Sequence, residues 1–475
     1  MKKLLTILAV GLSVFSLSAQ AAKLKELSNS KLNIIFIFAD DWGYGDLSAH
    51  GHQGLKTPNL DKMIAEGTEF QQFNVCSPVC SSSRTAVMTG NFPSRHGMHE
   101  HIAGHELNAA RGMPDYLDPS VVMLPRLLQQ AGYKTAHYGK WHLSNTMTAD
   151  VALVPMDYGY DDTRVFNGSG PAVAGGPKGY HSSAFTTNCV KYTIDFIKKH
   201  KDTSPFFVNL WIHESHQAIE PTPEQREPYK DVAEPQQSYY SVITSADAQL
   251  GKLFAYLKES GLDKNTLVLF SSDNGPESNA NEKTWQSVGV TAGLRGQKRS
   301  LFEGGVKVPF IVRLPDYIPA GQLNKDSVIA AVDLLPTFCD IAGVKLPEGY
   351  KPDGEVVTKA LQGSKYDRSK TILQYWQGNS SGNNWPRLSA KNTKWKLYTN
   401  FDKSKIELYD YKHDWAEENN LASQHPEIVE KLLAEAFEYY KSLNITHDNS
   451  KPGGGLGSRH DLKTKKEKTS KKTKE

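Results

Sequence analysis

The stretch Asn33–Asp41, which reads Asn-Ile-Ile-Phe-Ile-Phe-Ala-Asp-Asp, decides the fold class of this chain of 475 residues. A continuous apolar run of this length is typical of a central strand in a parallel sheet, because helices cover both faces of such a sheet. Asp40 and Asp41 follow at the carboxyl end of the strand, where open α/β sheets bind ligands. Adjacent carboxylates repel each other unless a cation lies between them, so the pair predicts a hard metal ion. A solvated turn is the alternative for this pair taken alone.

Apolar runs and amphipathic segments alternate along most of the chain, at a spacing that predicts an α/β fold. We expect a mixed, mostly parallel central sheet flanked by helices, with further strands over 68–73, 133–138, 205–212, 266–272 and 307–313 and helices over 58–67, 123–131, 184–200, 236–260 and 331–342. The pattern then changes to short strands over 371–375, 394–399 and 405–409 and one helix over 426–443. This second pattern predicts a smaller C-terminal subdomain with an antiparallel sheet and a helix.

Four segments follow from these patterns. Residues 1–21 resemble a signal peptide, with Lys2, Lys3, an apolar run and Ala19-Gln20-Ala21 as a cleavage site. Residues 22–365 form the α/β domain, 366–450 the C-terminal subdomain and 451–475 a disordered basic tail. The first apolar run is too short to span a bilayer. No cysteine lies near the cleavage site, so we expect no lipid anchor there. We therefore expect a periplasmic or secreted protein without a membrane span.

Charge and cysteine content exclude two classes of protein. The formal net charge is +3, but the lysine-rich tail from Arg459 onward carries a surplus of five positive charges, and Lys2 and Lys3 belong to the signal segment. The body between is slightly acidic, which argues against a nucleic-acid partner. The 4 cysteines allow at most one disulfide if Cys80 is modified, and Cys189 with Cys339 is one candidate pair. The chain is no disulfide scaffold.

Chemically active residues follow four of the predicted strands. They are Asp40 with Asp41, Lys140 with His142, His213 with His216, and Asp273 with Asn274. The carboxyl ends of parallel strands meet at one edge of a sheet, so we expect these pairs to lie together. Asp40, Asp41, Asp273 and Asn274 offer only oxygen ligands, which favours one Ca²⁺ per chain ahead of Mg²⁺. No cysteine and histidine spacing is typical of zinc.

A second segment, Val79–Gly90, places Cys80 between an apolar residue and a predicted helix start. The serines that follow Cys80 are good helix caps, and Gly90 is suited to close the helix. The free N–H groups of a helix start attract anions, and Arg84 offers a planar guanidinium for an oxyanion. Cys80 is therefore a candidate nucleophile in an anion pocket. The alternative is a buried, inert cysteine beside a helix.

This segment resembles the signature of the type I, formylglycine-dependent sulfatases, Cys-x-Pro-Ser-Arg followed by an apolar run and Thr-Gly. Ser82 departs from it, since the family has Pro or Ala there. The stretch Gly132–His142 resembles the second signature, and matches continue from Asp40-Asp41 to Arg295-Gly296-Gln297-Lys298. Several motifs in one order are more specific than any single motif. The resemblance implies the alkaline phosphatase superfamily fold and a sulfuric ester hydrolase, with Cys80 oxidised to formylglycine by a maturation enzyme.

The resemblance also implies roles for the metal and the nucleophile. Asp40, Asp41, Asp273 and Asn274 would bind calcium together with an oxygen of modified Cys80. The hydrated aldehyde would attack sulfur and form a covalent sulfo-enzyme intermediate, with Asp273 as the candidate proton acceptor.

The other site residues would then bind the sulfate and move protons. Lys140 and Lys298 would hold the sulfate, and Arg84 would orient the hydrate. His216 would protonate the leaving oxygen, and His142 would take the proton whose loss expels sulfate. We assign His213 and Arg295 to substrate contacts.

Export and a group of aromatic and polar residues in C-terminal loops favour a sulfated glycan substrate, such as a carrageenan-type galactan or a glycosaminoglycan; the group is Trp376, Asn383, Trp385 and Arg387. A phosphate or phosphonate ester hydrolase is the alternative enzyme. A sulfated-glycan binding protein is the alternative if Ser82 prevents modification of Cys80.

Overall fold

A central sheet of eight strands organises the computed structural model, which describes residues 32–144, 153–166, 184–216, 219–282, 285–378 and 385–445. The strand order is β11-β2-β10-β7-β1-β6-β4-β5. The strands are β1 (Asn33–Ala39), β2 (Thr68–Phe70), β4 (Lys134–Lys140), β5 (Asp162–Phe166), β6 (Phe206–Trp211), β7 (Thr266–Ser272), β10 (Phe310–Arg313) and β11 (Gln322–Asn324). Strands β7, β1, β6, β4 and β5 are parallel, whereas β10 is antiparallel to β7 and to β2. The predicted mixed, mostly parallel sheet is confirmed.

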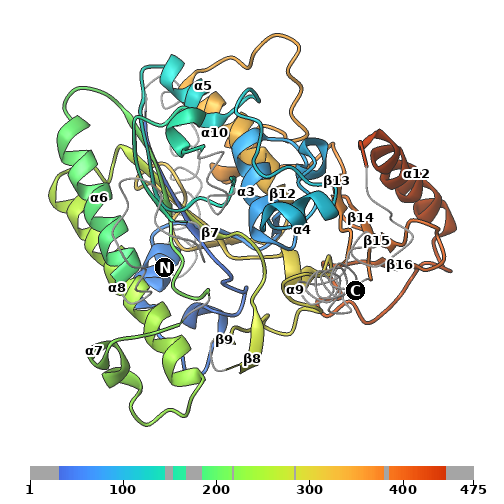
Figure 1. Ribbon diagram of the computed structural model, residues 1–475, viewed down its shortest axis with the longest axis horizontal. Helices are drawn as coiled ribbons and strands as arrows, with labels where there is room; N and C mark the ends of the chain where they lie inside the picture. Colours follow the sequence, from blue (N-terminus) through green and yellow to red (C-terminus); the bar gives the residue numbers. More distant parts are fainter. Residues whose placement is uncertain are drawn as a thin grey trace, which may run out of the picture.

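Strand β1 is buried on both faces, as its continuous apolar sequence predicts. Ile34, Phe36 and Phe38 face one core, and Ile35 and Ile37 face the other. Helices α3 (Cys80–Thr89), α5 (Leu124–Gln130) and α10 (Leu334–Ala342) cover the first face, and α2 (Pro58–Ala65), α6 (Phe185–His200) and α8 (Gln236–Glu259) cover the second. Figure 1 shows α6 and α8 side by side on one side of the sheet and α3, α5 and α10 on the other.

The C-terminal subdomain is a four-stranded antiparallel sheet with the order β13-β14-β15-β16. Its strands are β13 (Ile372–Tyr375), β14 (Leu388–Lys391), β15 (Lys396–Thr399) and β16 (Ile406–Tyr409), and α12 (Pro426–Ser442) packs on it (Figure 1). We did not predict β14, because Leu-Ser-Ala-Lys has little β propensity. It is held by its pairing with β13 and β15.

Short elements connect these parts, and two predicted strands are shorter than expected. The segment 68–73 divides into β2 and β3 (Phe73–Asn74), and β10 starts only at Phe310, after the short helix α9 (Glu303–Val306). The remaining short elements are β8 (Ser278–Glu282), β9 (Trp285–Val288), β12 (Ile329–Ala330), α4 (His105–Ala110), α7 (Pro223–Arg226), α11 (Thr358–Leu361), η2 (Ser48–His50), η3 (Pro93–His96), η4 (Pro155–Tyr158), η6 (Glu227–Tyr229) and η7 (Ala331–Asp333).

The cysteines correct one expectation. All four are buried as free thiols, so the Cys189–Cys339 disulfide is wrong. Cys189 belongs to the core under α6 and Cys339 to the core under α10, and the sheet separates these cores. Within the described ranges, no helix has the length and hydrophobicity that a membrane crossing requires. The expected signal peptide (1–21) and basic tail (451–475) lie outside the described residues.

Candidate active site

The carboxyl ends of β1, β4, β6 and β7 bring together the pairs that follow these strands in the sequence. Three carboxylates form the centre of the site. Oxygen atoms of Asp40, Asp41 and Asp273 lie within 4.8 Å of one another, and all three residues are buried. The backbone N–H of Asp41 donates to Asp273 Oδ1 over 3.2 Å, which joins the ends of β1 and β7. Asp41 adopts a left-handed conformation with φ 61°, an uncommon backbone for a non-glycine residue that turns the chain here.

Three cationic side chains are paired with these carboxylates. Arg84 donates to Asp273 Oδ2 from Nη2 over 2.6 Å and from Nε over 3.1 Å. Lys140 Nζ lies 2.7 Å from Asp40 Oδ2, and Lys298 Nζ lies 2.5 Å from Asp41 Oδ2. Buried charges are stable only when they are paired, so each cation compensates one carboxylate.

The carboxylates differ in their electrostatic environment. Burial raises the pKa of Asp40, but Lys140, His216 and His213 more than offset it and hold the pKa well below its usual range. Burial raises the pKa of Asp41, and burial together with neighbouring Asp40 raises the pKa of Asp273 to about 7. Asp40 is thus a permanent anion, while Asp41 and Asp273 would gain from a further positive charge.

The oxygen atoms of this cluster fit a metal ion. Asp40 Oδ1 and Asn274 Oδ1 are buried and make no hydrogen bond within the described part of the chain. Asn274 instead donates its Nδ2 to Asp41 Oδ1 over 2.7 Å. Asp40 Oδ1 has only an ion pair with Arg84 Nη2 at 3.6 Å. Buried polar atoms are normally hydrogen-bonded, so these two oxygens in a cluster of three carboxylates fit a hard cation that binds oxygen.

Cys80 is the first residue of α3, and it faces His142. Its Sγ atom lies 3.0 Å from His142 Nδ1, while His142 Nε2 lies 2.9 Å from the carbonyl oxygen of Ile102. A carbonyl can only accept, so Nε2 carries the hydrogen and Nδ1 presents a lone pair to residue 80. Burial, followed by the charge of Lys140, lowers the pKa of His142 well below its usual value, which keeps the ring neutral. Burial raises the pKa of the Cys80 thiol.

The serines after Cys80 do not cap α3 as we expected. The N-cap is Val79, which makes no side-chain cap, and the serines are buried in the first turn. Ser81 Oγ accepts from Ile102 N over 2.9 Å, and Ser82 Oγ donates to Glu100 O over 3.1 Å. Both bonds therefore hold the loop whose Ile102 carbonyl orients His142. Ser82, where the sequence departs from the signature, is part of this support.

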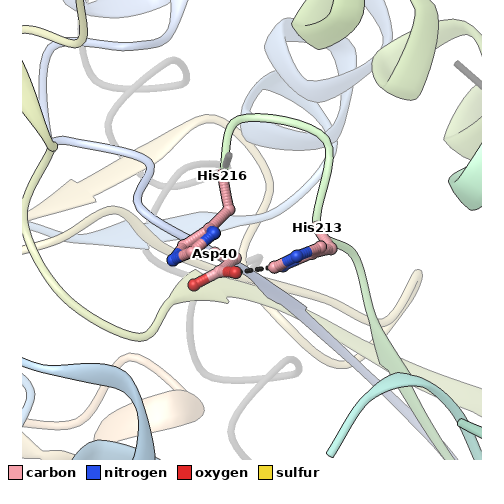
Figure 2. A group of neighbouring side chains, drawn as sticks. All are labelled: Asp40, His213 and His216. Atoms are coloured by element: carbon pink, nitrogen blue, oxygen red, sulfur yellow. Dashed lines mark hydrogen bonds and ion pairs between the residues drawn. The ribbon is translucent and has the colours of Figure 1, made fainter. Parts of the chain in front are cut away.

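His213 and His216 flank Asp40 (Figure 2). Asp40 Oδ2 accepts from His213 Nδ1, and the two imidazole rings stack with centroids 4.8 Å apart. His216 Nε2 lies 4.0 Å from Asp41 Oδ2. His213 is fully buried, whereas the His216 side chain is 14% exposed. The structure places the His213 ring against Asp40 and leaves His216 at the accessible side, and the substrate contact of His213 stays a prediction.

Two glycines allow the strand ends to approach. A Cβ atom on Gly139 would lie 1.9 Å from the Trp211 carbonyl oxygen, and Gly139 has φ 121°, so only glycine fits beside β6 just before Lys140. A Cβ atom on Gly275 would lie 1.9 Å from the Gly304 carbonyl oxygen. This contact brings α9 against the end of β7.

Arg295 does not join the cluster, although we assigned it to substrate. Its guanidinium stacks on Phe302 at 3.6 Å and bonds to Glu407 (2.9 Å) and Tyr409 (3.0 Å) of β16. It connects the site loop to the C-terminal sheet. The C-terminal loop residues also differ from expectation, because Trp376 and Arg387 are buried, with Arg387 bonded to backbone carbonyls. Asn383 lies outside the described residues.

Two residues near the site were not predicted. Asp46 accepts from the backbone N–H groups of Gly43 (2.7 Å) and Val290 (3.0 Å), which fixes the loop after Asp41. Its place in Gly-Tyr-Gly-Asp, a turn signal, could have identified it. Arg299 is the second; its sequence position beside Lys298 reads as ordinary surface charge.

Comparison with known proteins agrees with this arrangement. The Sulfatase family model matches residues 32–344, and the model described as N-sulphoglucosamine sulphohydrolase, C-terminal, matches residues 296–441. The chain is 31% identical over 389 residues to N-acetylgalactosamine-6-sulfatase of Rattus norvegicus, covering 73% of this chain and 68% of the relative. It is 25% identical to N-acetylgalactosamine-6-O-sulfatase of Bacteroides thetaiotaomicron, covering 87% and 94%.

Solved structures share the fold. The crystal structure of Ps i-CgsB in complex with k-i-k-neocarrahexaose superposes with a TM-score of 0.76 at 23% identity, covering 87% of this chain and 94% of that chain. The phosphonate monoester hydrolase of Agrobacterium radiobacter gives a TM-score of 0.60 at 19% identity, covering 86% and 95%. The fold alone therefore does not separate sulfate from phosphonate esters. The family model and the relative at 31% identity are both sulfatases. The chain therefore belongs to the sulfatase family, the sulfuric ester hydrolases.

Proposed function

We propose that this protein is an exported sulfatase that removes sulfate from a sulfated glycan, with Cys80 as the precursor of its nucleophile. The observation that carries the proposal is the 3.0 Å contact between Cys80 Sγ and His142 Nδ1, beside three clustered carboxylates. Burial raises the pKa of the Cys80 thiol and keeps it protonated. Oxidation of this thiol to formylglycine would supply an aldehyde hydrate, in which one hydroxyl can attack sulfur and the other can later lose a proton to expel sulfate.

His142 is suited to act as a base at residue 80. The Ile102 carbonyl accepts the hydrogen of Nε2, so Nδ1 can take a proton from a hydroxyl group at residue 80. Ser81 and Ser82 support the geometry by holding the loop 100–102 against α3. A positioned base of this kind contributes about 10²- to 10⁴-fold to the rate.

Lys140, Lys298 and Arg84 supply positive charge around the transferred group. Their nitrogen atoms already lie within 2.5 to 2.7 Å of site carboxylates, so their positions are fixed before substrate binds. Fixed cations in a buried site stabilise the negative charge of a transferring sulfuryl group without reorganisation. Arg84 also donates to the Lys140 carbonyl oxygen over 3.2 Å, which ties α3 to β4.

Asp40, Asp41, Asp273 and Asn274 would hold one divalent cation. A purely oxygen donor set favours Ca²⁺, with Mg²⁺ second, and the bound ion would neutralise sulfate charge. Asp40, His213 and His216 form a second set close enough for a metal. The oxygen set is the better site, because His213 Nδ1 already bonds to Asp40 and, within the described residues, Asp40 Oδ1 and Asn274 Oδ1 make no hydrogen bond.

His216 is suited to protonate the leaving oxygen. It is the more exposed of the two histidines, and burial with the charge of Lys140 lowers its pKa well below the usual value. The negative charge of a bound sulfate ester would raise that pKa, so substrate itself would prepare the acid.

The substrate class rests on the relatives. Those named above act on N-acetylgalactosamine-6-sulfate by their names, and Ps i-CgsB was solved with a carrageenan oligosaccharide. Glycosaminoglycans and carrageenan-type galactans are therefore the substrates to test. The expected signal segment, with Lys2 and Lys3 before an apolar run, supports a periplasmic or secreted location.

A sulfate-release screen tests the proposal. Purified protein, coexpressed with a formylglycine-generating enzyme, is incubated with defined sulfated oligosaccharides and with matched phosphate and phosphonate esters. We expect sulfate release by the wild type and none by Cys80→Ala. Peptide mass spectrometry of residue 80 gives the independent readout, with an aldehyde expected. Phosphonate turnover exceeding sulfate turnover would favour the alternative enzyme, and an unmodified thiol in protein that binds but does not hydrolyse would favour a glycan-binding protein.

A further inference from the structure

Arg299 is held at the edge of the active site by contacts that fix both its backbone and its side chain. Its backbone N–H donates to the Pro78 carbonyl oxygen over 3.0 Å, two residues before Cys80. Its Nη1 lies 2.5 Å from Glu277 Oε2, and Glu277 is 5% exposed in its side chain. A carboxylate that is buried behind it therefore aims the guanidinium.

The backbone of Arg299 is strained. Its φ angle of 68° lies in the left-handed region, which is unfavourable for a non-glycine residue. Asp41 (φ 61°) and His142 (φ 56°) of the active site share this property, as do Ala292, Asp316, Lys403 and Glu417 elsewhere in the described chain. Strain of this kind persists where surrounding structure imposes it, and it concentrates at functional sites. At Arg299 the strain lets adjacent residues face different ways: Lys298 Nζ reaches Asp41 inside the site, while the Arg299 side chain remains 25% exposed.

The charged surroundings of Arg299 place it near the site residues. Glu277, Glu100 and Asp41 all interact electrostatically with its guanidinium, and the Arg299 charge in turn acts on His101. The His101 ring centroid lies 6.4 Å from that of His142, and the His101 side chain is 36% exposed. Arg299 thus lies near Asp41, near Pro78 just before the nucleophile, and near the loop of residues 100–102. Its side chain is on the accessible side.

We propose that Arg299 binds a second anionic group of the substrate, a carboxylate or a further sulfate close to the sulfate ester that is cleaved. A guanidinium has five N–H donors, and the Glu277 contact uses those of one nitrogen. Its planar fork matches a carboxylate or sulfate. His101 is suited to assist, because its Nδ1 bonds to Glu100 over 2.8 Å, which leaves Nε2 as an acceptor for a sugar hydroxyl. The inference rests on the proposed function, and it predicts preference for polyanionic glycans.

The test compares substrates that differ only in the second anion. We would measure kcat/KM for a sulfated oligosaccharide with an adjacent uronate carboxylate, its carboxyl-reduced counterpart, and a disulfated and monosulfated pair. The wild type should prefer the second anion about 10- to 100-fold, the range of a charge-assisted hydrogen bond. In Arg299→Gly the ratio of the two kcat/KM values should fall to about 1, and Arg299→Lys should retain part of the preference. The arm in which the ratio is largest identifies carboxylate or sulfate as the group bound.

The variants separate binding from folding. Glycine suits φ 68°, so Arg299→Gly removes the side chain while relieving backbone strain. Lys264→Gln is the matched control, because Lys264 is a 69% exposed cation just before β7, at the opposite end of the sheet from Asp273. It should leave the ratio unchanged.

A binding measurement keeps the result independent of turnover. In the Cys80→Ala background, the affinity for the same oligosaccharides should show the same preference, and Arg299→Gly should remove it. Equal affinity of this background protein for substrates with and without the second anion would overturn the inference, as would a preference that survives Arg299→Gly. A wild type that binds with this preference but releases no sulfate would instead count against the proposed function.

Discussion

His142 Nδ1 lies 3.0 Å from Cys80 Sγ, and the opposite nitrogen of the same ring bonds to the Ile102 carbonyl oxygen. The Ile102 carbonyl thereby fixes the tautomer of the imidazole. The lone pair of Nδ1 therefore faces residue 80 at any pH at which the ring is neutral.

His142→Gln should lower kcat by about 10²- to 10⁴-fold, because it removes the base at residue 80. KM for the preferred glycan sulfate should change much less, since the imidazole faces residue 80. Steady-state kinetics on the substrate identified by the release screen gives both numbers. His52→Gln is a suitable control, because His52 packs against Tyr240 on α8, away from α3. A kcat within twofold of wild type would exclude His142 as the base.

Metal removal should inactivate the protein, and Ca²⁺ should restore activity better than Mg²⁺. The physical reason is the all-oxygen set of Asp40, Asp41, Asp273 and Asn274, in which two oxygens make no hydrogen bond to any described residue. Ca²⁺ should also raise the melting temperature, because an ion that binds only the folded state stabilises it. Thermal unfolding with and without chelator measures this effect without substrate.

Asp41→Asn provides the matched test of the metal site. It keeps the shape of the side chain but removes one charge, and it should abolish the Ca²⁺-dependent rise in melting temperature. Asp61→Asn, at an aspartate in the first turn of α2, should retain the rise. An undiminished rise in Asp41→Asn would place the ion elsewhere.

We expect the ionisation of Glu417 to lower the free energy of unfolding as pH rises toward the neutral range. Burial, with repulsion from Glu303, raises the pKa of Glu417 to about 7 despite attraction by Lys396. A raised pKa means that the folded state binds more protons than the unfolded state between the two pKa values, so the free energy of unfolding falls as pH increases from about 4.5 to about 7. Glu417→Gln should reduce this slope, measured by urea unfolding at several pH values.

Glu407 offers a comparison of opposite sign. Burial raises its pKa, but Tyr409 and Arg295 outweigh burial and lower it. The ionised Glu407 therefore stabilises the fold above its unfolded pKa, and this contribution is lost as pH falls. Glu407→Gln should reduce stability at neutral pH and have little effect in acid. The two substitutions should therefore change the slope of unfolding free energy against pH in opposite directions, and changes of the same sign would contradict the assignment.

Glu303→Gln should destabilise the protein by about 3–5 kcal/mol, the cost of leaving buried charge unpaired. Glu303 is buried in α9 and bonds to Lys391 (2.9 Å) and Lys396 (2.6 Å) of the C-terminal sheet, with Lys307 at 3.3 Å. Lys307→Met should cost much less, because Lys307 Nζ makes no hydrogen bond within the described residues and burial lowers its pKa. Denaturant unfolding of both variants compares them, and equal losses would refute the asymmetry.

Much of the fold could be predicted from periodicity. The apolar run Asn33–Ala39 forms β1 with both faces buried, and the long amphipathic segment from Gln236 forms α8. Hydrophobic pattern works here because burial is the dominant driving force and each segment is long. Strand β14 escaped prediction because its four residues are held by cross-strand partners rather than by their own propensity.

The sequence by itself determined which residues stand at the strand ends: Asp40, Asp41, Lys140 and Asp273 directly follow or end apolar segments, and parallel strands bring such ends to one edge. Tertiary structure alone decided how the side chains are divided among partners. It directed Arg295 to Glu407, buried His213 against Asp40, separated Cys189 from Cys339 by the sheet, and turned Arg299 toward the accessible side. The reason is that the position of each strand and helix along the chain follows from local hydrophobic pattern, whereas hydrogen-bond and charge partners depend on distances between residues far apart in the chain.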